Sequence, residues 1–275
     1  MRNEAIKVEK LTRVENTLFF PLLSRTLDAK SPKPILNDKK AIELLEKLDF
    51  DFLTLQKSLE KPAIIGHALR GRYFDNRIRS YLEKYPNGIV ISLGSGLDTR
   101  FDRLDNGLLT FIDIDLPEVI IVRRKLLSET LRNPFVGCSI LDYSWIPQIL
   151  ALASKVECPV LFIAEAVLMY LPKTDVQSLF QKLSISFPNA EIIFDVYTNF
   201  MVKEANKNVG LKEFQAEFKW GVNNLHDIEK WAPNLRLVSE WSFFNDKEAR
   251  VGIFKILRFI PFIRKMSRIV HFRFE

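Results

Sequence analysis

The chain has 275 residues, of which 47% are hydrophobic and 27% charged, and its net charge is +6 at pH 7. This composition is typical of a globular protein and excludes a disordered chain. No apolar run reaches the roughly 20 residues of a membrane span, and the N-terminal MRNEAIKVEK lacks the apolar segment of a secretory signal. Cys138 and Cys158 are too few for a disulfide framework, so we expect buried thiols in a bacterial-type cytoplasmic protein.

The first 85 residues predict a helical cap. In SPKPILNDKKAIELLEKLD, Asn37 or Asp38 is placed to cap a helix whose apolar residues fall on one face. In PAIIGHALRGRYFDNRIRSYLEKY, Pro62 opens a second helix that continues to the break at PNG.

Strands and helices alternate after this point. The predicted strands are IVISL (89–93), LLTFIDI (108–114), PFVGCSI (134–140), PVLFIAEAV (159–167), AEIIFDVY (190–197), LRLVSEWSFF (235–244) and RIVHFRF (268–274). Helices are predicted over 117–131, from about Thr174 or Asp175, and within the polar stretch 198–235. The pattern predicts a single α/β domain with a Rossmann-like, mostly parallel sheet of seven strands, helices on both faces and a closing strand pair. The helical cap (1–85) precedes a ligand-binding core (86–197), a lid-like insert (198–235) and closing strands (236–275).

A glycine corner follows the first strand of the core, in IVISLGSGLDTRFDRLDNGLLTFIDIDLPE. Gly94 and Gly96 permit positive φ and a close approach of backbone to a ligand. Asp113 and Asp115 stand where the next strand should end, and one carboxylate there can accept both hydroxyl hydrogens of a ribose. The spacing therefore indicates a nucleoside.

The corner lacks the rest of a dinucleotide fingerprint. Its third glycine position is Thr99, and Asp98 would repel an approaching pyrophosphate. A turn with two glycines and a carboxylate favours a nucleoside without phosphate that carries a positive centre. S-adenosylmethionine has this chemistry, and we prefer it to a nicotinamide dinucleotide.

Several spaced motifs resemble the leucine carboxyl methyltransferase family, which includes the tetracenomycin-type polyketide O-methyltransferases. They are LGSGLDTR, DIDLPEVI, CSILDYS and IAEAVLMYLP, with RTLDAKSPKPILNDKKAIELL and ALRGRYFDNRI upstream. The resemblance extends from about Arg25 to about Asp195, and residues 198–265 match little of it. It implies a Rossmann-like S-adenosylmethionine-dependent O-methyltransferase.

The resemblance also implies roles for individual residues. Gly94 and Gly96 would lie against the methionine part of the donor, and Asp115, with Asp113 as a neighbour, would take the ribose hydroxyls. The remaining donor contacts are Asp142 and Tyr143 at the adenine, Glu165 at the amino-acid end, and one of Arg70, Arg72 or Arg77 at the donor carboxylate.

Each role has a structural alternative. Glu165 could instead form a structural pair with one of these arginines, and Asp113 could cap a helix. Arg77 could lie on the surface. Tyr170 is expected to belong to the core or to line the pocket, and not to be a catalyst.

The expected mechanism is in-line methyl transfer that depends on positioning. A carboxylate acceptor needs no base, whereas a phenol gains from one. His67, His226 and His271 have no metal-ligand spacing, so no metal is expected, and the sequence assigns no catalytic residue. Aromatic side chains that would either wall an acceptor pocket or pack the lid are Phe19, Phe20, Tyr197, Phe200, Phe214, Phe218 and Trp220.

Most of the net charge lies near the C-terminus. Residues 245–275 contribute +5 to it. This segment contains three acidic residues, Asp246, Glu248 and Glu275, and eight basic ones, Lys247, Arg250, Lys255, Arg258, Arg264, Lys265, Arg268 and Arg273. An anionic membrane surface or nucleic acid would suit this segment, but a solvated basic face is the simpler interpretation.

Other functions compete with the small-molecule or carboxyl O-methyltransferase. They are a nucleic-acid methyltransferase or binding module that uses the basic segment, a nicotinamide-dependent oxidoreductase, and an inactive family member. A small-molecule acceptor is expected and nucleic acid is not. The sequence leaves open the oligomeric state and the acceptor, which is a phenol, a small carboxylate or a protein C-terminus.

Overall fold

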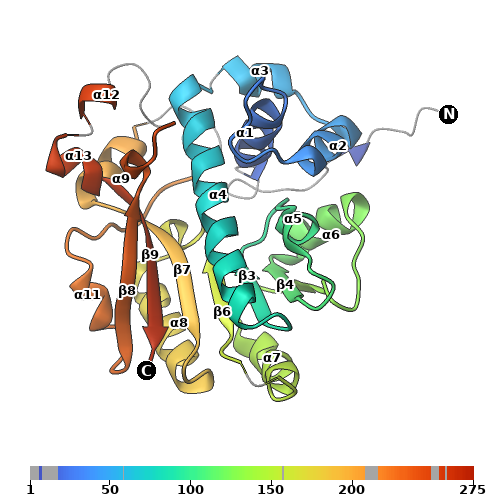
Figure 1. The fold of residues 1–275 in the computed structure, drawn as a ribbon, viewed down its shortest axis with the longest axis vertical. Helices are drawn as coiled ribbons and strands as arrows, with labels where there is room; N and C mark the ends of the chain where they lie inside the picture. The colour runs from blue at the N-terminus through green and yellow to red at the C-terminus, as the bar shows by residue number, and fades with distance from the viewer. Residues whose placement is uncertain are drawn as a thin grey trace.

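The computed structural model describes residues 6–7, 18–57, 59–156, 158–207, 216–248, 254–257 and 259–275. A helical cap lies at one end of the molecule, coloured blue to cyan in Figure 1. Its elements are β1 (Ile6–Lys7), α1 (Phe19–Ala29), α2 (Lys39–Lys47), β2 (Leu48–Asp49), α3 (Phe52–Lys57) and α4 (Lys61–Lys84), with β1 and β2 paired in parallel. Asp38 caps α2 by accepting a hydrogen bond from the Ala41 N–H at 3.1 Å.

A seven-stranded sheet forms the centre of the protein. Its order is β5-β4-β3-β6-β7-β9-β8. The bounds are β3 (Ile89–Leu93), β4 (Thr110–Asp115), β5 (Phe135–Gly137), β6 (Leu161–Ala164), β7 (Glu191–Tyr197), β8 (Leu235–Ser242) and β9 (Ser267–Phe274). The strands are parallel except for β9, which pairs antiparallel with β7 and β8. The predicted fold class, with a mostly parallel sheet and a closing strand pair, is confirmed.

Helices cover both faces of the sheet. The helices that follow the cap are α5 (Arg100–Leu104), α6 (Pro117–Leu126), α7 (Ile146–Ala153), α8 (Lys173–Ser186), α9 (Asn199–Ala205), α11 (His226–Glu229), α12 (Phe254–Leu257) and α13 (Pro261–Lys265), with short 3₁₀ turns η2 (Tyr143–Trp145), η3 (Leu168–Tyr170) and η4 (Phe243–Asn245). Ile89, Ile91 and Leu93 pack with α7 and α8, whereas Val90 packs with α4, which crosses the front of the sheet in Figure 1. β3 is buried along its whole length, as expected of a central parallel strand covered on both sides.

Two predicted helical regions differ from the structure. The helix expected over 117–131 ends at Leu126, because Glu129 leaves the helical path to accept a hydrogen bond from the Phe135 N–H at 2.8 Å. Residues 216–225 of the predicted insert are not helical. Their backbone bonds to neighbouring loops instead: Lys219 N donates to Met169 O and Val222 N to Tyr197 O, each at 2.8 Å.

The topology marks where a ligand would bind. β3 pairs with β4 on one side and β6 on the other, so the strand order reverses there, and ligands of such sheets bind beyond the carboxyl ends of these strands. Phe19 and Leu22 of α1 and Leu44 of α2 pack with Ile120 and Leu126 of α6, which fixes the cap beside this point. In the part of the chain that the structure describes, no helix has the length and apolar character needed to cross a bilayer.

Candidate functional site

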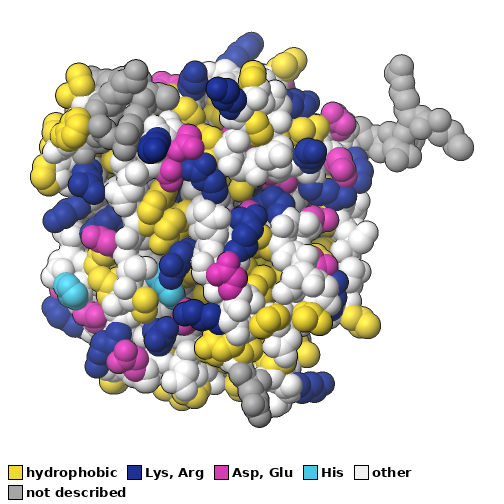
Figure 2. Space-filling view, viewed as in Figure 1, with side chains coloured by type: hydrophobic (Ala, Val, Ile, Leu, Met, Phe, Trp, Pro, Cys, Tyr) yellow, Lys and Arg dark blue, Asp and Glu magenta, His cyan; other side chains and the backbone are white. Residues whose placement is uncertain are grey.

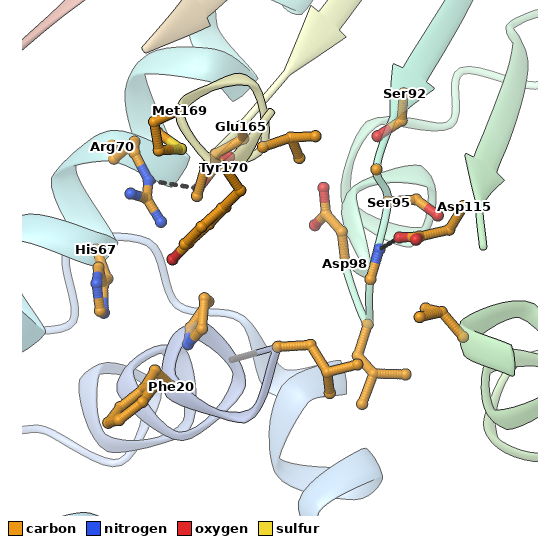
Figure 3. Close-up of a pocket in the computed structure, with 18 of the residues that line it drawn as sticks. Phe20, His67, Arg70, Ser92, Ser95, Asp98, Asp115, Glu165, Met169 and Tyr170 are labelled. Carbon is orange, nitrogen blue, oxygen red and sulfur yellow. Dashed lines mark hydrogen bonds and ion pairs between the residues drawn. The ribbon is translucent and has the colours of Figure 1, made fainter. Parts of the chain in front are cut away.

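A cavity of about 530 Å³ lies at the carboxyl ends of β3, β4, β5 and β6 (Figure 3). One wall, the strand-end wall, consists of the loops that follow these strands, over residues 92–98, 115–119, 138–140 and 165–167. The opposite wall, the cap wall, consists of Leu18, Phe20, Pro21, Leu59, Ala63, His67, Tyr197, Met201, Ala205 and Phe218. Arg25 and Arg70 also line the cavity, and Tyr170 projects between the two walls.

The glycine turn after β3 forms the centre of the strand-end wall. Gly94 and Gly96 have φ values of 74° and 50°, which residues with a Cβ rarely adopt. A Cβ on Gly94 would lie 2.4 Å from Val167 Cγ2, so the turn packs directly on the loop after β6. The Gly94 and Ser95 N–H groups both donate to Ile114 O, at 2.8 and 3.1 Å. The turn therefore has the positive φ that the sequence indicated, and it packs closely on Val167. A close approach of its backbone to a ligand stays a prediction.

Asp115 lies at the end of β4 with its carboxylate beside the glycine turn. Its Oδ2 accepts a hydrogen bond from Gly96 N at 2.6 Å, and its Oδ1 accepts one from Leu116 N at 2.7 Å (Figure 3). Asp115 lines the cavity. Two backbone N–H groups thus fix this carboxylate at the end of β4, where the sequence predicted a carboxylate for the ribose hydroxyls.

Asp113 does not line the cavity, and the prediction of a direct role for it is wrong. Its side chain is fully buried, and its Oδ2 accepts hydrogen bonds from Arg123 Nη2 at 2.6 Å and Asn133 Nδ2 at 2.8 Å. Burial raises the pKa of Asp113 to about 6, against the opposing effect of Arg123. Arg123 also donates to Gly96 O at 3.1 Å and Asp98 O at 2.7 Å. Asp113 thus supports the glycine turn through Arg123, and it does not cap a helix.

Glu165, at the end of β6, is shared between two arginines. Arg70 Nε donates to its Oε1 at 2.9 Å, and Arg100 Nη2 donates to its Oε2 at 2.7 Å. Burial alone would raise the pKa of Glu165, but Arg100 and Arg70 outweigh it, and the pKa lies below its usual value. The structural pairing foreseen for Glu165 is therefore present, and both Glu165 and Arg70 also line the cavity.

Helix geometry separates the three candidate arginines. With about 100° per residue, Arg72 points away from the face of α4 that carries Arg70, and Arg77 lies on that face but roughly 10 Å further along. Arg72 donates to Asp246 Oδ1 at 2.7 Å and Glu248 Oε1 at 3.1 Å, and Arg77 lies 2.7 Å from His271 Nδ1. Neither lines the cavity. The predicted site role of Arg72 is wrong; of the three candidates only Arg70 lines the cavity, and its contact with the donor stays a prediction.

Asp142 and Tyr143 follow the strand-end loop after β5 and lie outside the residues that line the cavity. Asp142 is exposed and accepts a hydrogen bond from Ser144 N at 3.2 Å, at the start of η2. The lining residues of this loop are Cys138, Ser139 and Ile140. Contact of Asp142 and Tyr143 with an adenine stays a prediction.

Two polar atoms of the glycine loop are buried without a hydrogen-bond partner. They are Ser95 Oγ and Asp98 Oδ1. The other Asp98 oxygen accepts from Arg100, and Arg103 Nη2 lies 3.6 Å from Oδ1. Burial raises the pKa of Asp98, but Arg100, Arg103 and Arg25 outweigh it and hold that pKa far below its usual range. Both residues line the cavity, so they offer an ionised carboxylate and a hydroxyl to a ligand.

Sequence reasoning missed Asp195 in β7. Its Oδ1 accepts a hydrogen bond from Ala166 N at 2.8 Å, and Arg70 Nη1 lies 3.4 Å from its Oδ2. Ala166 has a φ of 58°, a conformation unusual for a residue with a Cβ. Burial raises the pKa of Asp195 to about 6, although Arg70 opposes it. A carboxylate within the apolar strand EIIFDVY was the available signal.

The cap wall is largely apolar. His67 Nδ1 lies 2.7 Å from the buried Ser24 Oγ, and burial, followed by the charge of Arg70, lowers the pKa of His67 to about 3. The imidazole is therefore uncharged at neutral pH. Tyr170 and Tyr197 each pack against Phe218, with ring centroids 5.1 and 5.2 Å apart.

The predicted aromatic residues divide between pocket and core. Phe20, Tyr197 and Phe218 line the cavity, Phe19 and Trp220 are buried in the core, and Phe200 is exposed. Phe214 lies outside the described residues.

The other two histidines lie away from the cavity. His226 pairs with Glu229 and His271 with Glu191. In the described ranges, no three His, Cys, Asp or Glu side chains are grouped so that they could hold a metal ion.

Comparison with known proteins gives the family. A family model described as leucine carboxyl methyltransferase matches residues 20–184. The tetracenomycin polyketide synthesis O-methyltransferase TcmP of Streptomyces glaucescens is 28% identical over 96% of this chain and 98% of its own length. The S-adenosyl-L-methionine-dependent methyltransferase dpfgK of Gibberella zeae is 28% identical over 88% of this chain and 86% of its own.

Solved structures agree on the fold. A DUF574 family protein of Streptomyces avermitilis superimposes with a TM-score of 0.56 at 13% identity, over 92% of this chain and 96% of its own. A putative methyltransferase of Thermobifida fusca gives a TM-score of 0.53 at 14% identity, over 91% and 93%. Since the family model matches more than half of the chain, including the glycine turn, Asp115 and Glu165, the protein belongs to the leucine carboxyl methyltransferase family.

Proposed function

We propose that this protein is an S-adenosylmethionine-dependent O-methyltransferase whose acceptor is a neutral, largely apolar molecule with an aromatic hydroxyl. The methyltransferase class follows from membership of the family. Transfer to oxygen is supported by the similarity to TcmP, which is an O-methyltransferase of polyketide synthesis. The choice of acceptor rests on the contrast between the two walls of the cavity.

The strand-end wall suits the donor. Asp115 is fixed by two backbone N–H groups where it would accept the ribose hydroxyls, and the turn at Gly94 and Gly96 would lie against the methionine part. The unpartnered atoms Ser95 Oγ and Asp98 Oδ1 suit a donor ammonium group, and Arg70 suits the donor carboxylate. Asp142 and Tyr143 would border the adenine. An ionised Asp98 at this turn disfavours the pyrophosphate of a nicotinamide dinucleotide.

The charges around the cavity disfavour a carboxylate acceptor. Arg25 bonds to Asp38 at 2.9 Å and Leu97 O at 2.8 Å. Arg70, which already pairs with Glu165 and Asp195, is assigned to the donor carboxylate. No lysine is among the described residues that line the cavity. A carboxylate acceptor would lose its hydration against the apolar cap wall and would find no cation to pair with, which is costly. A neutral phenol would bury its apolar ring surface there, which is favourable.

Bound S-adenosylmethionine supplies a methyl group on a sulfonium, whose leaving group needs no protonation. The cap wall holds the acceptor hydroxyl toward the strand-end wall, and this positioning accounts for most of the rate. His67 is the proposed hydrogen-bond partner of the acceptor hydroxyl on the cap wall. Its ring is uncharged, and its Nδ1 is fixed by Ser24 Oγ at 2.7 Å. With a pKa of about 3 the ring orients the hydroxyl, and the proton that the hydroxyl loses passes to water.

Calorimetry tests the donor part of the proposal. Wild type should bind S-adenosylmethionine and S-adenosylhomocysteine and should not bind NAD. Asp115→Asn should weaken S-adenosylhomocysteine binding by roughly tenfold, because the amide accepts fewer ribose hydrogens. Asp105→Asn is the matched control, since Asp105 pairs with Arg132 away from the cavity, and it should change the affinity less than about twofold. Binding of NAD alone, or equal affinity of both variants, would contradict the assignment.

Product chemistry tests the acceptor part. Aromatic hydroxyls and aromatic carboxylates of matched size should be offered with a methyl-labelled donor. Methyl ethers survive mild base, whereas methyl esters release labelled methanol. Stable label on the hydroxyl compounds is expected; base-labile label on the carboxylates would overturn the proposed acceptor class while leaving the donor site intact.

A further inference from the structure

An exposed apolar patch lies beside the cavity, on the two short helices near the C-terminus. We define the C-terminal patch as Ile256, Phe259, Ile260 and Phe262 of the α12–α13 segment together with Phe200 of α9. Their exposed fractions are 70%, 72%, 43%, 52% and 45%. Large apolar side chains gathered at this level of exposure mark an interaction surface.

The patch lies at an edge of the molecule. In Figure 1, α12 and α13 project at the upper left, with α9 beside them. Hydrophobic side chains gather at the same place in Figure 2, with Lys and Arg side chains below them. The rings of Phe200 and Phe262 pack edge to face with centroids 5.2 Å apart, so the two segments form one surface.

The charge of this segment is uniformly positive. Arg264 and Lys265 are exposed in α13, and the sequence from Val251 to Phe274 contains no Asp or Glu. The nearby carboxylates of Asp246 and Glu248 are paired with Arg72, at 2.7 and 3.1 Å. Apolar side chains next to unopposed basic residues are the combination that binds the interface of an anionic bilayer.

The patch is also joined to the cavity. α9 presents Phe200 to the patch, while Met201 and Ala205 of the same helix line the cap wall. The Thr198 N–H, which precedes α9, donates to Met266 O, which follows α13, at 3.0 Å. A surface bound at the patch would therefore lie against the outer side of a cavity wall.

We infer that the C-terminal patch attaches the protein reversibly to the surface of an anionic lipid bilayer. The side chains of Phe259 and Ile256 enter the interface, and Arg264 and Lys265 contact the lipid headgroups. An anionic bilayer fits better than an acidic protein or a second copy of this chain, because exposed apolar side chains lie next to exposed basic ones in a segment that contains no carboxylate side chain. This inference does not depend on the proposed function, since its test measures attachment without methyl transfer.

Vesicle sedimentation of the whole chain tests the inference. The protein should sediment with vesicles of phosphatidylcholine and phosphatidylserine, and not with vesicles of phosphatidylcholine alone, and the binding should weaken as salt rises. Ile256→Ser with Phe259→Ser removes apolar surface, and Arg264→Gln with Lys265→Gln removes charge. Each pair should weaken the partition by roughly tenfold.

Matched controls lie elsewhere on the surface. Leu131→Ser with Ile185→Ser removes side chains that are 100% and 79% exposed, and Lys125→Gln with Lys182→Gln removes two exposed charges. These should change the partition less than about twofold. Phe259→Trp provides a second readout that keeps the apolar surface: its fluorescence should shift to the blue with the anionic vesicles.

Three results would overturn the inference. They are no sedimentation of wild type with the anionic vesicles, equal loss in patch and control variants, or an unshifted Phe259→Trp spectrum. If the patch variants instead convert a dimer to a monomer in sedimentation velocity, a second copy occupies the patch. If wild type binds random oligonucleotides and no vesicles, nucleic acid occupies the patch.

Discussion

The two walls of the cavity are built in opposite ways. The strand-end wall is formed by short loops directly after strands, and its charged groups are paired: Glu165 with Arg70 and Arg100, and Asp115 with backbone N–H groups. The cap wall comes from segments that are far apart in the sequence, and it is mostly apolar with an uncharged His67. This difference is the basis of the proposal that the charged wall receives the donor and the neutral wall the acceptor.

The strongest test of this contrast substitutes the glycine turn. Gly94→Ala places a Cβ 2.4 Å from Val167 at a φ of 74°, so the turn must move. The affinity for S-adenosylhomocysteine should fall by at least roughly 100-fold, because the backbone no longer approaches the ligand.

Gly107→Ala is the matched control for this change. Gly107 has a φ of 82° but no atom within 4 Å of the added Cβ. It should lower the free energy of unfolding by about 1 kcal/mol and leave the affinity within about twofold. Equal losses of affinity in both variants would show that the effect is general backbone strain.

The next test removes the polar group of the cap wall. His67→Ala should lower kcat for an aromatic hydroxyl acceptor by about 100-fold, because the hydroxyl loses the side chain that orients it, while the affinity for S-adenosylhomocysteine changes little. Since the pKa of His67 is about 3, its ionisation should add no step to the wild-type rate profile between pH 5 and pH 8. Stopped-flow or discontinuous rate measurements across this range check both points. A fall in donor affinity equal to the fall in kcat would mean that the cap wall also contributes to donor binding, which contradicts the proposal.

A narrower cap wall should affect only the acceptor. Ala205→Phe adds a ring where α9 lines the cavity, so KM for a large acceptor should rise by roughly tenfold with donor affinity unchanged. Lys203→Phe adds the same ring at an exposed position of α9 and is the control. Initial rates with acceptors of increasing size measure the effect, and equal rates for large and small acceptors would contradict it.

The smallest effect is expected at the opposite end of the sheet. Burial raises the pKa of Glu191, but hydrogen bonds from His271 and Arg273 outweigh it and lower the pKa from 4.5 to about 2. A lowered pKa stabilises the fold above pH 4.5, and this contribution is lost as the pH falls from about 4.5 to about 2. Glu191→Gln should therefore lower the free energy of unfolding at pH 7 by about 1 kcal/mol after allowance for solvent screening.

The Glu191→Gln variant should also become less sensitive to acid than wild type. Thermal unfolding from pH 3 to pH 7 measures this, alongside calorimetry that should find unchanged donor affinity. A change in donor affinity would show that the far end of the sheet is coupled to the cavity.

The sequence was sufficient for the order of elements and for the strand-end wall. Gly94, Gly96, Asp115 and Glu165 were identifiable because a turn or a strand end is defined by residues that are neighbours along the chain, and all four line the cavity. Short apolar runs rich in β-branched residues likewise gave all seven strands of the sheet, since the composition of a strand is a local property. Local patterning failed at residues 216–225, where backbone hydrogen bonds to other loops replaced the expected helix.

Only the tertiary structure decided between residues that are equivalent by sequence. Asp113 and Asp115 lie on the same face of β4, but Arg123 from α6 covers the first and leaves the second at the cavity. Arg70 and not Arg72 reaches Glu165 because the rotation of α4 is set by packing of Phe74 and Ile78 on the sheet. The cap wall joins residues from Leu18 to Phe218, and such contacts depend on how distant segments pack. Local chemistry thus specified the residues of the proposed donor site, and long-range packing determined their partners and the shape of the cavity beside them.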